Sequence, residues 1–434
     1  MNKINVGLLG CGTVGTGVAK ILFDKSDLLT ARTDTVINLK YIADLDIDNN
    51  RGLSCDKSVF TNDSMKIIND PEIDIVIETI GGETIAKDLI LEAIENGKHI
   101  VTANKALIAK HGNEIFRKAS EKGVSFFYEA SVGGCMPVIK TIRESLIGNI
   151  IHSVNGILNG TCNYILTRIA EEGIPFDEVL KQAQDEGYAE QDPSFDIDGI
   201  DTAHKIAILA SISYGMEINF EDVYVEGIRN ITPFDLELAE YFGYTIKLLA
   251  ISKIEGGEVD IRVHPTMIPS NHILASVKST LNAVNIKGDE AGDVLLYGHG
   301  AGMKPTASAI ISDVVDISRN KNTNSTRISS TAHLNRKNEI RIKPIEQVES
   351  RFYFRFSVED RPGVLSIISG ILGDYGISLE SVQQKGQKKT GYVPVIMLTH
   401  LASEKSAKDA LIEINSLDVV KQPTVAIRIE DNFE

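Results

Sequence analysis

A glycine-rich run close to the N-terminus constrains the fold of this chain more than any other feature. Residues 4–9, INVGLL, have the composition of a buried strand and lead directly into GCGTVG at residues 10–15, after which helical periodicity begins. A strand, a G-x-G-x-x-G turn and a helix in this order are typical of a phosphate-binding turn. Gly10 would make the tight turn, Gly12 would let a pyrophosphate approach, and Gly15 would let the helix pack against the strand. Glycine triplets also occur in ordinary turns, but this context predicts a dinucleotide-binding site.

Short apolar runs and helical patterns then alternate as far as residue 130. The strand-like runs lie at 36–43, 73–79, 99–103 and 124–130, and the helical patterns lie at 85–96 and 107–122. Strands that alternate with helices form parallel sheets through right-handed crossovers. The runs are apolar on both faces, as expected for strands that helices cover on both sides. The predicted fold class is therefore α/β, with a doubly wound, Rossmann-type dinucleotide-binding domain at the N-terminus.

The pattern changes at about Gly133. Longer helical segments now mix with alternating strands, which predicts an α+β domain over residues 133–302 that is inserted into the nucleotide-binding unit. A helical pattern at 303–319 is expected to return to the first domain. The dinucleotide-binding domain would then comprise residues 1–132 and about 303–320.

The C-terminal part divides into a polar segment and a compact unit. Residues 321–350 carry several basic side chains, which would suit a contact site in so acidic a chain, but a solvated linker is the better interpretation. Residues 351–434 follow the order strand, helix, strand, strand, helix, strand. That βαββαβ order predicts a ferredoxin-like domain.

Charge and composition narrow the class of function. The net charge of −16 argues against a nucleic-acid partner and favours small-molecule chemistry. The hydrophobic content of 43% is typical of a globular protein, and neither a membrane-spanning run nor a signal peptide is found. The four cysteines, Cys11, Cys55, Cys135 and Cys162, lie far apart in the sequence. This spacing favours buried, reduced thiols and a cytoplasmic location.

An acidic segment that ends in a lysine is the clearest sign of chemistry. Residues 183–205, AQDEGYAEQDPSFDIDGIDTAHK, crowd acids around a turn and close on Lys205. Asp201 and Lys205 are four residues apart, so a helix would place them on one face. A solvated acidic loop followed by a surface ion pair is the plain alternative. Acids suited to an ammonium group, beside a lysine suited to proton transfer, predict an amino-acid active site.

A second lysine follows a strand at the edge where doubly wound sheets bind ligands. Lys105, in VTANK, is placed to reach a nicotinamide or a substrate carboxylate, unless it is only a solvent-exposed lysine at a helix start. If Lys105 and Lys205 share a cleft, each lowers the pKa of the other, and partial burial acts in the same direction. A lysine with a lowered pKa can serve as a general acid or base near neutral pH.

The end of the second strand bears on the choice of cofactor. Asp44 at this position would hydrogen-bond a ribose diol, which favours NAD, whereas a site for NADP usually offers a cation. Lys40 and Arg51 are nearby in the sequence, so the preference stays open, with a lean towards NAD.

Three further loops contain glycine. EASVGGCMP, at 129–137, could coordinate a hard cation through backbone carbonyls beside Glu129, although a hinge between domains is the plainer interpretation. GILNGTCN, at 156–163, is suited to lining a pocket. GHGAGMKPT, at 298–306, could approach the cofactor or simply connect the domains.

Taken together, these segments resemble the homoserine dehydrogenase family over nearly the whole chain. The matching segments are, in order, GCGTVG, VTANKAL, EASVGGCMP, GILNGTCNYIL, GYAEQDPSFDIDGIDTAHK and GHGAGMKPTASAI. The segment that ends in Lys205 is the most specific of them. The resemblance implies an NAD(P)-dependent oxidoreductase that interconverts L-homoserine and L-aspartate 4-semialdehyde in threonine, methionine and isoleucine biosynthesis. It also implies that the inserted domain carries catalysis and dimerisation.

The resemblance further implies roles for individual residues. Lys205 would move the hydroxyl proton, with Lys105 as its partner at the reacting centre and as a cofactor contact. The substrate would be held by Glu190, Asp196 and Asp201, and the other cofactor contacts would be Gly10, Gly12, Thr13, Val14, Gly15, Gly187 and Gly302. A sodium ion would bind, mostly through backbone carbonyls, at Glu129, Val132, Gly134 and Met136. The family commonly has an arginine just before the acid that matches Asp44, but this chain has Ala43, which puts a strong NADP preference in doubt.

The C-terminal unit resembles an ACT domain, through DRPGVL at 360–365 and GISLESVQ at 376–383. Such domains pair edge to edge and bind amino acids at the interface. The resemblance therefore implies a homodimer or homotetramer with an amino-acid effector, and L-threonine is the natural candidate. A dimerisation module that binds no ligand is the alternative.

Two other functions fit parts of the pattern. Another amino-acid dehydrogenase, acting on aspartate for example, would need a pocket for a second carboxylate, which the acidic segment disfavours. A non-catalytic metabolite sensor would give no reason for Lys105 and Lys205 to occur together with the acids. We therefore expect homoserine dehydrogenase activity, with no nucleic-acid or membrane partner.

Overall fold

The computed structural model describes every residue except 1, 50, 324–339, 385–391, 432 and 434. Two compact units emerge from the contacts of the chain. The first unit comprises residues 1–160, 201–223 and 280–338, and the second comprises residues 161–200, 224–279 and 339–434. Most of the predicted linker, with Arg327, Arg336 and Lys337, lies outside the described residues.

A parallel sheet forms the centre of the first unit. Its strand order is β3-β2-β1-β4-β5-β6, and every pair of neighbours is parallel. The strands are β1 (Asn2–Leu9), β2 (Thr35–Ala43), β3 (Phe60–Thr61), β4 (Ile75–Glu78), β5 (His99–Thr102) and β6 (Phe126–Phe127). Each interior strand is an apolar run that helices cover, so the predicted α/β fold with a Rossmann-type sheet is confirmed.

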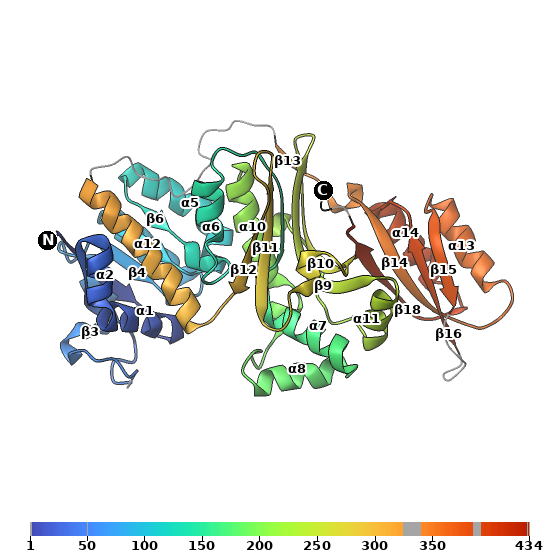
Figure 1. The fold of residues 1–434 in the computed structure, drawn as a ribbon, viewed down its shortest axis with the longest axis horizontal. Coiled ribbons are helices and arrows are strands. Elements are labelled where there is room, and N and C mark those ends of the chain that lie inside the picture. The colour runs from blue at the N-terminus through green and yellow to red at the C-terminus, as the bar shows by residue number, and fades with distance from the viewer. Residues whose placement is uncertain (1, 50, 324–339, 385–391, 432, 434) are drawn as a thin grey trace. The chain divides into compact units, whose positions relative to one another are not determined.

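The helices of the first unit follow the predicted alternation. They are α1 (Thr13–Asp24), α2 (Ser26–Thr33), α3 (Ser64–Ile68), α4 (Thr84–Glu95), α5 (Lys105–Lys122), α6 (Val138–Lys140), α10 (Ile200–Tyr214) and α12 (Met303–Thr323). Helix α12 lies along α1 (Figure 1). Val18 of α1 and Ala307, Ile310 and Val314 of α12 are buried in the same core as the sheet. The chain therefore returns to the nucleotide-binding fold after residue 303.

Two expected elements are shorter than their patterns suggest. The strand expected over 124–130 ends at Phe127 and gives way to a 3-10 turn, Glu129–Ser131. In the predicted α+β region, the apolar pattern at 136–146 forms only the short α6, followed by a π-helical turn over Thr141–Ser145. The carboxylate of Glu129 turns back to accept hydrogen bonds from two amides at the start of α6, which ends the strand.

The remaining strands of the first unit are antiparallel. They are β7 (Ile151–Ile157), β11 (Leu281–Gly288) and β12 (Gly292–His299), with β11 between the other two. Strand β7 leads into the GILNGTCN loop, and β12 leads into the GHGAG loop. Both loops therefore begin at strand ends.

The second unit contains a mainly antiparallel sheet with helices beside it. Its strands are β8 (Tyr224–Val225), β9 (Tyr244–Glu255), β10 (Glu258–Pro269), β13 (Arg341–Ile342), β14 (Glu349–Val358), β15 (Leu379–Gln384), β16 (Val393–Thr399), β17 (Ala402–Ser403) and β18 (Val420–Ile429). Its helices are α7 (Gly160–Glu172), α8 (Phe176–Asp185), α9 (Ser194–Ile197), α11 (Pro233–Tyr241), α13 (Val364–Asp374) and α14 (Glu404–Asn415).

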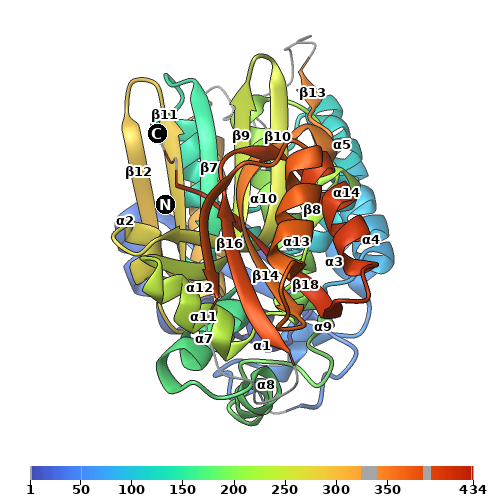
Figure 2. The ribbon, with the colours of Figure 1, turned by 90° about the vertical axis from the view of Figure 1, so that its right-hand side faces the viewer.

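The C-terminal domain has the predicted βαββαβ order, as β14, α13, β15, β16, α14 and β18. Helices α13 and α14 cover one face of its sheet (Figure 2). The sheet does not end at the domain. Strand β18 pairs with β14 on one side and in parallel with β10 on the other, through Thr266–Arg428 and Met267–Ile429. The C-terminal domain is thus hydrogen-bonded to the sheet of residues 244–269.

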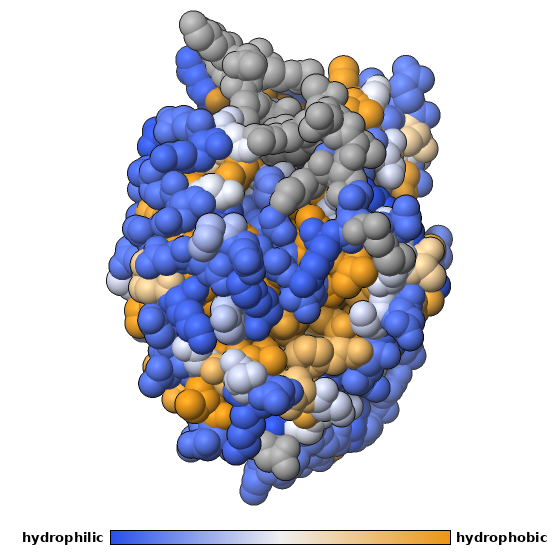
Figure 3. Space-filling model, turned by 90° about the vertical axis from the view of Figure 1, so that its left-hand side faces the viewer, coloured by the Kyte–Doolittle hydropathy of each residue, from blue (hydrophilic) through white to orange (hydrophobic). Residues whose placement is uncertain are grey.

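The surface and the cysteines complete the description. No helix among the described residues is long and apolar enough to cross a membrane, and hydrophilic residues dominate the face drawn in Figure 3. Cys11 and Cys162 are buried, as expected, but Cys135 is exposed and Cys55 is only partly buried. All four are free thiols.

Candidate active site

A carboxylate bound to two lysines forms the centre of the candidate site. Helix α10 places Asp201 and Lys205 one turn apart, with Lys205 Nζ 2.6 Å from Asp201 Oδ2. Lys105, the first residue of α5, brings its Nζ to 2.5 Å from the other oxygen, Oδ1. Asp201 and Lys205 are 2% and 6% exposed. The fold thus brings together two segments that are far apart in the sequence and that sequence analysis selected independently.

The two ammonium groups determine the charge of Asp201. Burial alone would raise the pKa of this carboxyl, but the attraction of Lys205 and Lys105 outweighs it and holds the pKa below its usual value. Asp201 is therefore ionised, and its negative charge lies between two positive charges. Because the carboxylate offsets their mutual repulsion, the buried Lys205 and the partly exposed Lys105 can remain close together.

Two groups beside strand β7 complete this cluster, and sequence analysis gave neither of them a role. The backbone carbonyl of Leu158 accepts a hydrogen bond from Lys205 Nζ at 2.6 Å. The side-chain amide of Asn159 donates to Asp201 Oδ2 at 2.8 Å. Asn159 had been noted only as part of a pocket-lining turn. A polar, small-residue turn directly after a buried strand was the available signal, because such turns place backbone and amide groups at a sheet end.

Lys105 is positioned by hydrogen bonds at the carboxyl ends of β4 and β5. Asn104 caps helix α5, accepting from the Leu107 amide at 3.1 Å and donating to Gly82 O at 2.7 Å. The fully buried carboxylate of Glu78 accepts from Thr102 Oγ1 at 2.5 Å and from the amides of the following loop. Sequence analysis missed Glu78, although an acid at the end of an otherwise apolar strand was a visible signal.

The other two predicted substrate acids lie in the second unit. Glu190 is exposed, and its backbone carbonyl accepts from the side chain of Gln184. Asp196 belongs to the short helix α9, and its backbone carbonyl lies 3.2 Å from Cys162 Sγ. Gly187 has a φ of +77° and is also exposed. The structure thus groups these three residues in one segment, 187–199, whereas the lysine cluster belongs to the first unit.

The glycine run has the geometry that a pyrophosphate requires. Gly10 has a φ of +91°, and a side chain there would meet the backbone of Thr79 at 2.8 Å. A Cβ on Gly15 would lie 2.1 Å from Gly10 O, so only glycine fits at this crossing. A Cβ on Gly12 would meet nothing within 4 Å, which leaves open space over the turn. No side chain of the described residues caps α1, so amides of its first turn, which begins with Thr13 and Val14, can bind an anion.

The acid at the end of β2 is bound to the glycine run and to an arginine. Asp44 accepts from the Cys11 amide at 2.6 Å, and Arg51 Nη2 lies 2.9 Å from its other oxygen. Arg51 Nε also donates to Cys11 O at 2.7 Å. Lys40, the other nearby cation, pairs with Asp70 and Glu72 instead. An acid and a cation therefore stand together beside the glycine run.

The loop at 129–137 packs against the last glycine loop. A Cβ on Gly134 would lie 2.6 Å from His299 O, which shows how closely the two backbones approach. Both oxygens of Glu129 accept amide hydrogen bonds, from Ile139 at 2.9 Å and Lys140 at 2.8 Å. Burial raises the pKa of Glu129 to about 7, against the lowering effect of those bonds. Gly302, with a φ of +119°, precedes α12.

The cation prediction receives no direct test from this geometry. Among the described residues, no group of three or more His, Cys, Asp or Glu side chains is arranged to hold a metal ion. The predicted site depends on the backbone carbonyls of Glu129, Val132, Gly134 and Met136 instead. Since the Glu129 carboxylate is already engaged, a cation in this loop would have to bind mainly to the main chain.

Comparison with known protein families covers most of the chain. Residues 10–129 match the model "Homoserine dehydrogenase, NAD binding domain", and residues 137–315 match the model "Homoserine dehydrogenase". Residues 352–418 match the ACT domain.

Individual relatives are similar over nearly their full length. A curated homoserine dehydrogenase of Pseudomonas aeruginosa is 44% identical over 435 residues, which cover 99% of each chain. The crystal structure of a homoserine dehydrogenase from Thiobacillus denitrificans has a TM-score of 0.93 at 43% identity and also covers 99% of each chain. A hyperthermophilic archaeal homoserine dehydrogenase, solved in complex with NADPH, has a TM-score of 0.62 at 27% identity and covers 73% of this chain and 97% of its own.

Proposed function

The chain belongs to the homoserine dehydrogenase family, and from this premise we propose how its residues perform the reaction. The enzyme is an NAD(P)-dependent oxidoreductase that interconverts L-homoserine and L-aspartate 4-semialdehyde. A bound nicotinamide cofactor supplies hydride exchange, and the protein supplies binding, orientation and proton transfer. The observation that carries the residue-level proposal is the cluster of the buried Asp201 and Lys205 with the partly exposed Lys105.

Lys205 is the proton carrier in this proposal. In alcohol oxidation it takes the proton of the substrate hydroxyl, and in aldehyde reduction it returns a proton to the oxygen. The support is that its Nζ is held at 2.6 Å by both Asp201 and the Leu158 carbonyl, which fixes the position of the ammonium group beside Lys105. Proton transfer by a positioned side chain typically contributes about 10²–10⁴-fold to rate.

Lys105 and Asp201 hold the reacting centre around that lysine. Asp201 keeps the two ammonium groups apart and aligned, and Lys105 lies at the sheet edge where a nicotinamide would bind. Glu190, Asp196 and Asp201 remain the proposed substrate contacts, and the family resemblance favours Glu190 and Asp201 as the partners of the ammonium group. Because Asp201 already contacts two lysines, Glu190 and Asp196 are the stronger candidates for direct contact.

The same turn and sheet edge hold the dinucleotide. Gly10, Gly12, Thr13, Val14 and Gly15 surround the open space at the start of α1. We further propose that NAD is preferred over NADP, because Asp44 is placed for a ribose diol and neutralises Arg51. Gly187 and Gly302 stay proposed contacts on the basis of family resemblance.

We also propose that the protein binds a sodium ion and an amino-acid effector, that it forms a homo-oligomer, and that it lies in the cytoplasm. The backbone carbonyls of the 129–136 loop would hold the ion, with two left-handed glycines, Gly133 and Gly134, turning the chain around it. An amino acid, with L-threonine as first candidate, would act through the ACT domain of a homodimer or homotetramer. The free cysteines support the cytoplasm as the location.

A spectrophotometric assay with a pair of lysine variants tests the active-site proposal. Lys105→Ala should lower turnover of L-homoserine about 10²-fold or more, and should weaken nucleotide binding, because this lysine contacts both the reacting centre and the cofactor. Lys110→Ala is the matched control, since Lys110 lies on the same helix and pairs only with Glu83 among the described residues. Wild-type turnover in Lys105→Ala would remove it from the site. Running the assay with NAD and NADP tests the proposed cofactor preference, and running it with and without L-threonine tests the proposed effector.

A further inference from the structure

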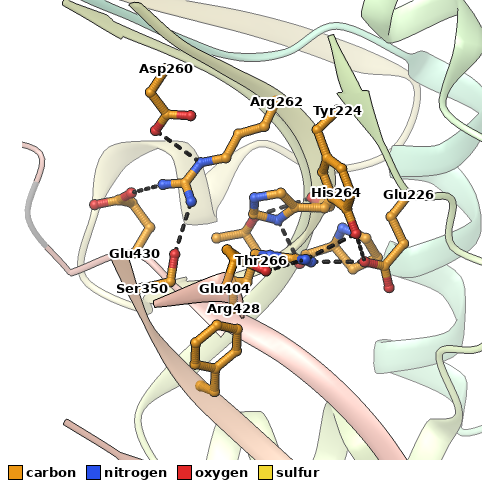
Figure 4. A network of polar contacts seen from close by, with 12 residues as sticks. Tyr224, Glu226, Asp260, Arg262, His264, Thr266, Ser350, Glu404, Arg428 and Glu430 are labelled. Carbon is orange, nitrogen blue, oxygen red and sulfur yellow. Dashed lines mark hydrogen bonds and ion pairs between the residues drawn. The ribbon is translucent and has the colours of Figure 1, made fainter. Parts of the chain in front are cut away.

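An arginine of the ACT domain connects three elements of the second unit. Arg428, on strand β18, is 8% exposed. It binds Glu404, the first residue of α14, through two hydrogen bonds of 2.5 and 2.8 Å. On its other side, Nη1 donates to Glu226 at 2.7 Å and Nη2 donates to the hydroxyl of Tyr224 at 3.0 Å. Tyr224 and Glu226 do not belong to the ACT domain, so Arg428 connects the ACT domain to strand β8 and the residue after it (Figure 4).

A second arginine and a buried histidine lie beside the contacts of Arg428. Arg262 of β10 donates to Ser350 of β14 at 2.8 Å and contacts Glu430, directly after β18. Between the two arginines lies His264, which is fully buried and bonded to Thr266 at 2.9 Å. Burial and the neighbouring arginines hold its pKa well below the usual value, so the ring is neutral. Figure 4 shows Arg262, His264 and Arg428 near one another, each with its own polar contacts.

The two residues after Glu226 make close backbone contacts with helix α9 and the residue that follows it. Helix α9 carries Asp196, one of the predicted substrate acids. The amide of Glu226 itself is bonded to Val263 O at 2.8 Å. The next residue, Gly227, lies so near to this segment that a Cβ would be 2.3 Å from Ile197 O and 2.5 Å from Asp198 Cα. The amide of Ile228 then donates to Ile197 O at 2.8 Å.

A second contact fixes the same segment from the other side. Arg229 forms an ion pair with Asp198 and donates to Ser194 Oγ at 3.0 Å. Residues 226–229 therefore contact both ends of helix α9, and α9 carries Asp196. The ion pair Arg428–Glu226 and the backbone contact of Gly227 with Ile197 therefore connect the ACT domain to helix α9. Helix α9 carries Asp196, a proposed substrate acid.

Residues 226–229 are held at Glu226 by Arg428, and most of them also line a cleft. Glu226, Gly227 and residues 229–232 line a cleft of about 1040 Å³ together with residues of helix α14 and strand β18 of the ACT domain. The segment can therefore shift towards the cleft if its hold on Arg428 is weakened, and a shift of residues 227 and 228 must move the backbone of Ile197 and Asp198.

We propose that Glu226 and Arg428 are positioning residues for substrate binding, through which the ACT domain sets the affinity for L-homoserine. The contact Arg428–Glu226 holds residues 227–229 in place, and these hold α9 and Asp196. This inference rests on the proposed role of Asp196 in binding the substrate. It predicts that loss of the contact changes substrate affinity without a matching change in nucleotide binding, because every proposed cofactor contact except Gly187 belongs to the first unit.

The test compares three conservative variants of the full chain. Glu226→Gln keeps the shape of the side chain and removes its charge, and at 35% exposure the site tolerates the change without leaving a buried unpaired group. We expect the KM for L-homoserine to rise about fivefold or more, with kcat within about twofold and the nucleotide Kd unchanged. Glu346→Gln is the matched control, because Glu346 lines the same cleft but forms no ion pair among the described residues. Asp196→Asn reports on the substrate site itself.

The pattern of the three KM values decides between outcomes. A rise in Glu226→Gln and Asp196→Asn, with no change in Glu346→Gln, supports the proposal. A rise in Asp196→Asn alone overturns the positioning role and leaves the substrate site intact. No change in Asp196→Asn overturns the substrate assignment, and the positioning role with it. Equal rises in both glutamate variants would assign the effect to net charge and overturn the proposal.

A milder variant guards against a folding defect. Tyr224→Phe removes only the hydroxyl contact and keeps the ring 4.9 Å from the Arg428 guanidinium. If Glu226→Gln melts earlier than the wild type, Tyr224→Phe should still raise the KM in the same direction by a smaller factor. A wild-type KM in a Tyr224→Phe protein of normal stability would count against the proposal.

Discussion

At the scale of single residues, the account depends on one carboxylate between two lysines. The spacing of Asp201 and Lys205 was sufficient to predict that they share a helix face, because four residues make about one turn. That Lys105 reaches the same carboxylate could only be expected as a possibility, since this contact depends on how two distant helices pack. The contribution of Leu158 could not be predicted at all, because a backbone carbonyl leaves no mark on the sequence.

The expected mutual lowering of the lysine pKa values illustrates the same limit. Two positive charges in one cleft lower each other's pKa, but this expectation leaves out any anion between them. The structure places Asp201 there, at 2.5 and 2.6 Å from the two ammonium groups. An interposed carboxylate opposes the repulsion on which the expectation was based.

Cofactor preference is a prediction at the same scale. Asp44→Ser should release the Arg51 guanidinium, which is then available to the 2′-phosphate of NADP. A charge-assisted hydrogen bond contributes roughly 1.5–3 kcal/mol, so we expect the ratio of kcat/KM for NADP to that for NAD to rise about tenfold or more. Steady-state kinetics with both cofactors measure this ratio.

The control for this change is Asp48→Ser, which alters the net charge equally at an exposed position further along the same loop. It should leave the ratio unchanged. A ratio that stays constant in Asp44→Ser would show that Arg51 does not reach the phosphate, and the lean towards NAD would lose its support.

At the scale of elements, long and strongly apolar patterns were predicted well and short ones were not. The strands and helices of the nucleotide fold begin and end within a few residues of their expected bounds. By contrast, the run at 124–130 continues its apolar pattern past the point where the strand ends. The cause is the hydrogen bonding of Glu129 to helix α6, a contact between segments that composition and periodicity do not reveal.

Strand β9 provides a prediction about pH and stability. Its Lys247 is 3% exposed and donates to Asn163 Oδ1 of α7 at 2.9 Å and to Val277 O at 2.5 Å. Burial, and to a lesser degree Lys278, lowers the pKa of Lys247 to about 8. Between this value and the ordinary pKa of about 10.4, the unfolded chain binds more protons than the folded one, so the free energy of unfolding rises with pH in this window.

Lys247→Met should abolish that contribution. The difference in unfolding free energy between wild type and variant should grow by up to roughly 3 kcal/mol from pH 7 to above pH 10, at 1.36 kcal/mol per pKa unit. Urea denaturation across this range measures it, with the exposed Lys181→Met as control. Parallel pH curves for wild type and Lys247→Met would contradict the lowered pKa.

At the scale of the whole molecule, the fold of the C-terminal domain could be predicted, but its pairing with the rest of the chain could not. A ferredoxin-like order was visible in residues 351–434, and the structure confirms it. The expectation of a separate domain behind a linker did not include the pairing of β18 with β10. Pairing between distant strands is set by tertiary packing and has no local signature. The network around Arg262 and Arg428, on which substrate positioning is proposed to depend, follows from that pairing.

The central claim is that Lys205 moves the proton, and a single-turnover measurement of hydride transfer tests it most directly. Lys205→Ala, saturated with cofactor and L-homoserine, should transfer hydride about 10²-fold or more slowly than the wild type, with an unchanged nucleotide Kd. Lys110→Ala, treated in the same way, should match the wild type. Hydride transfer at the wild-type rate in Lys205→Ala would contradict the account.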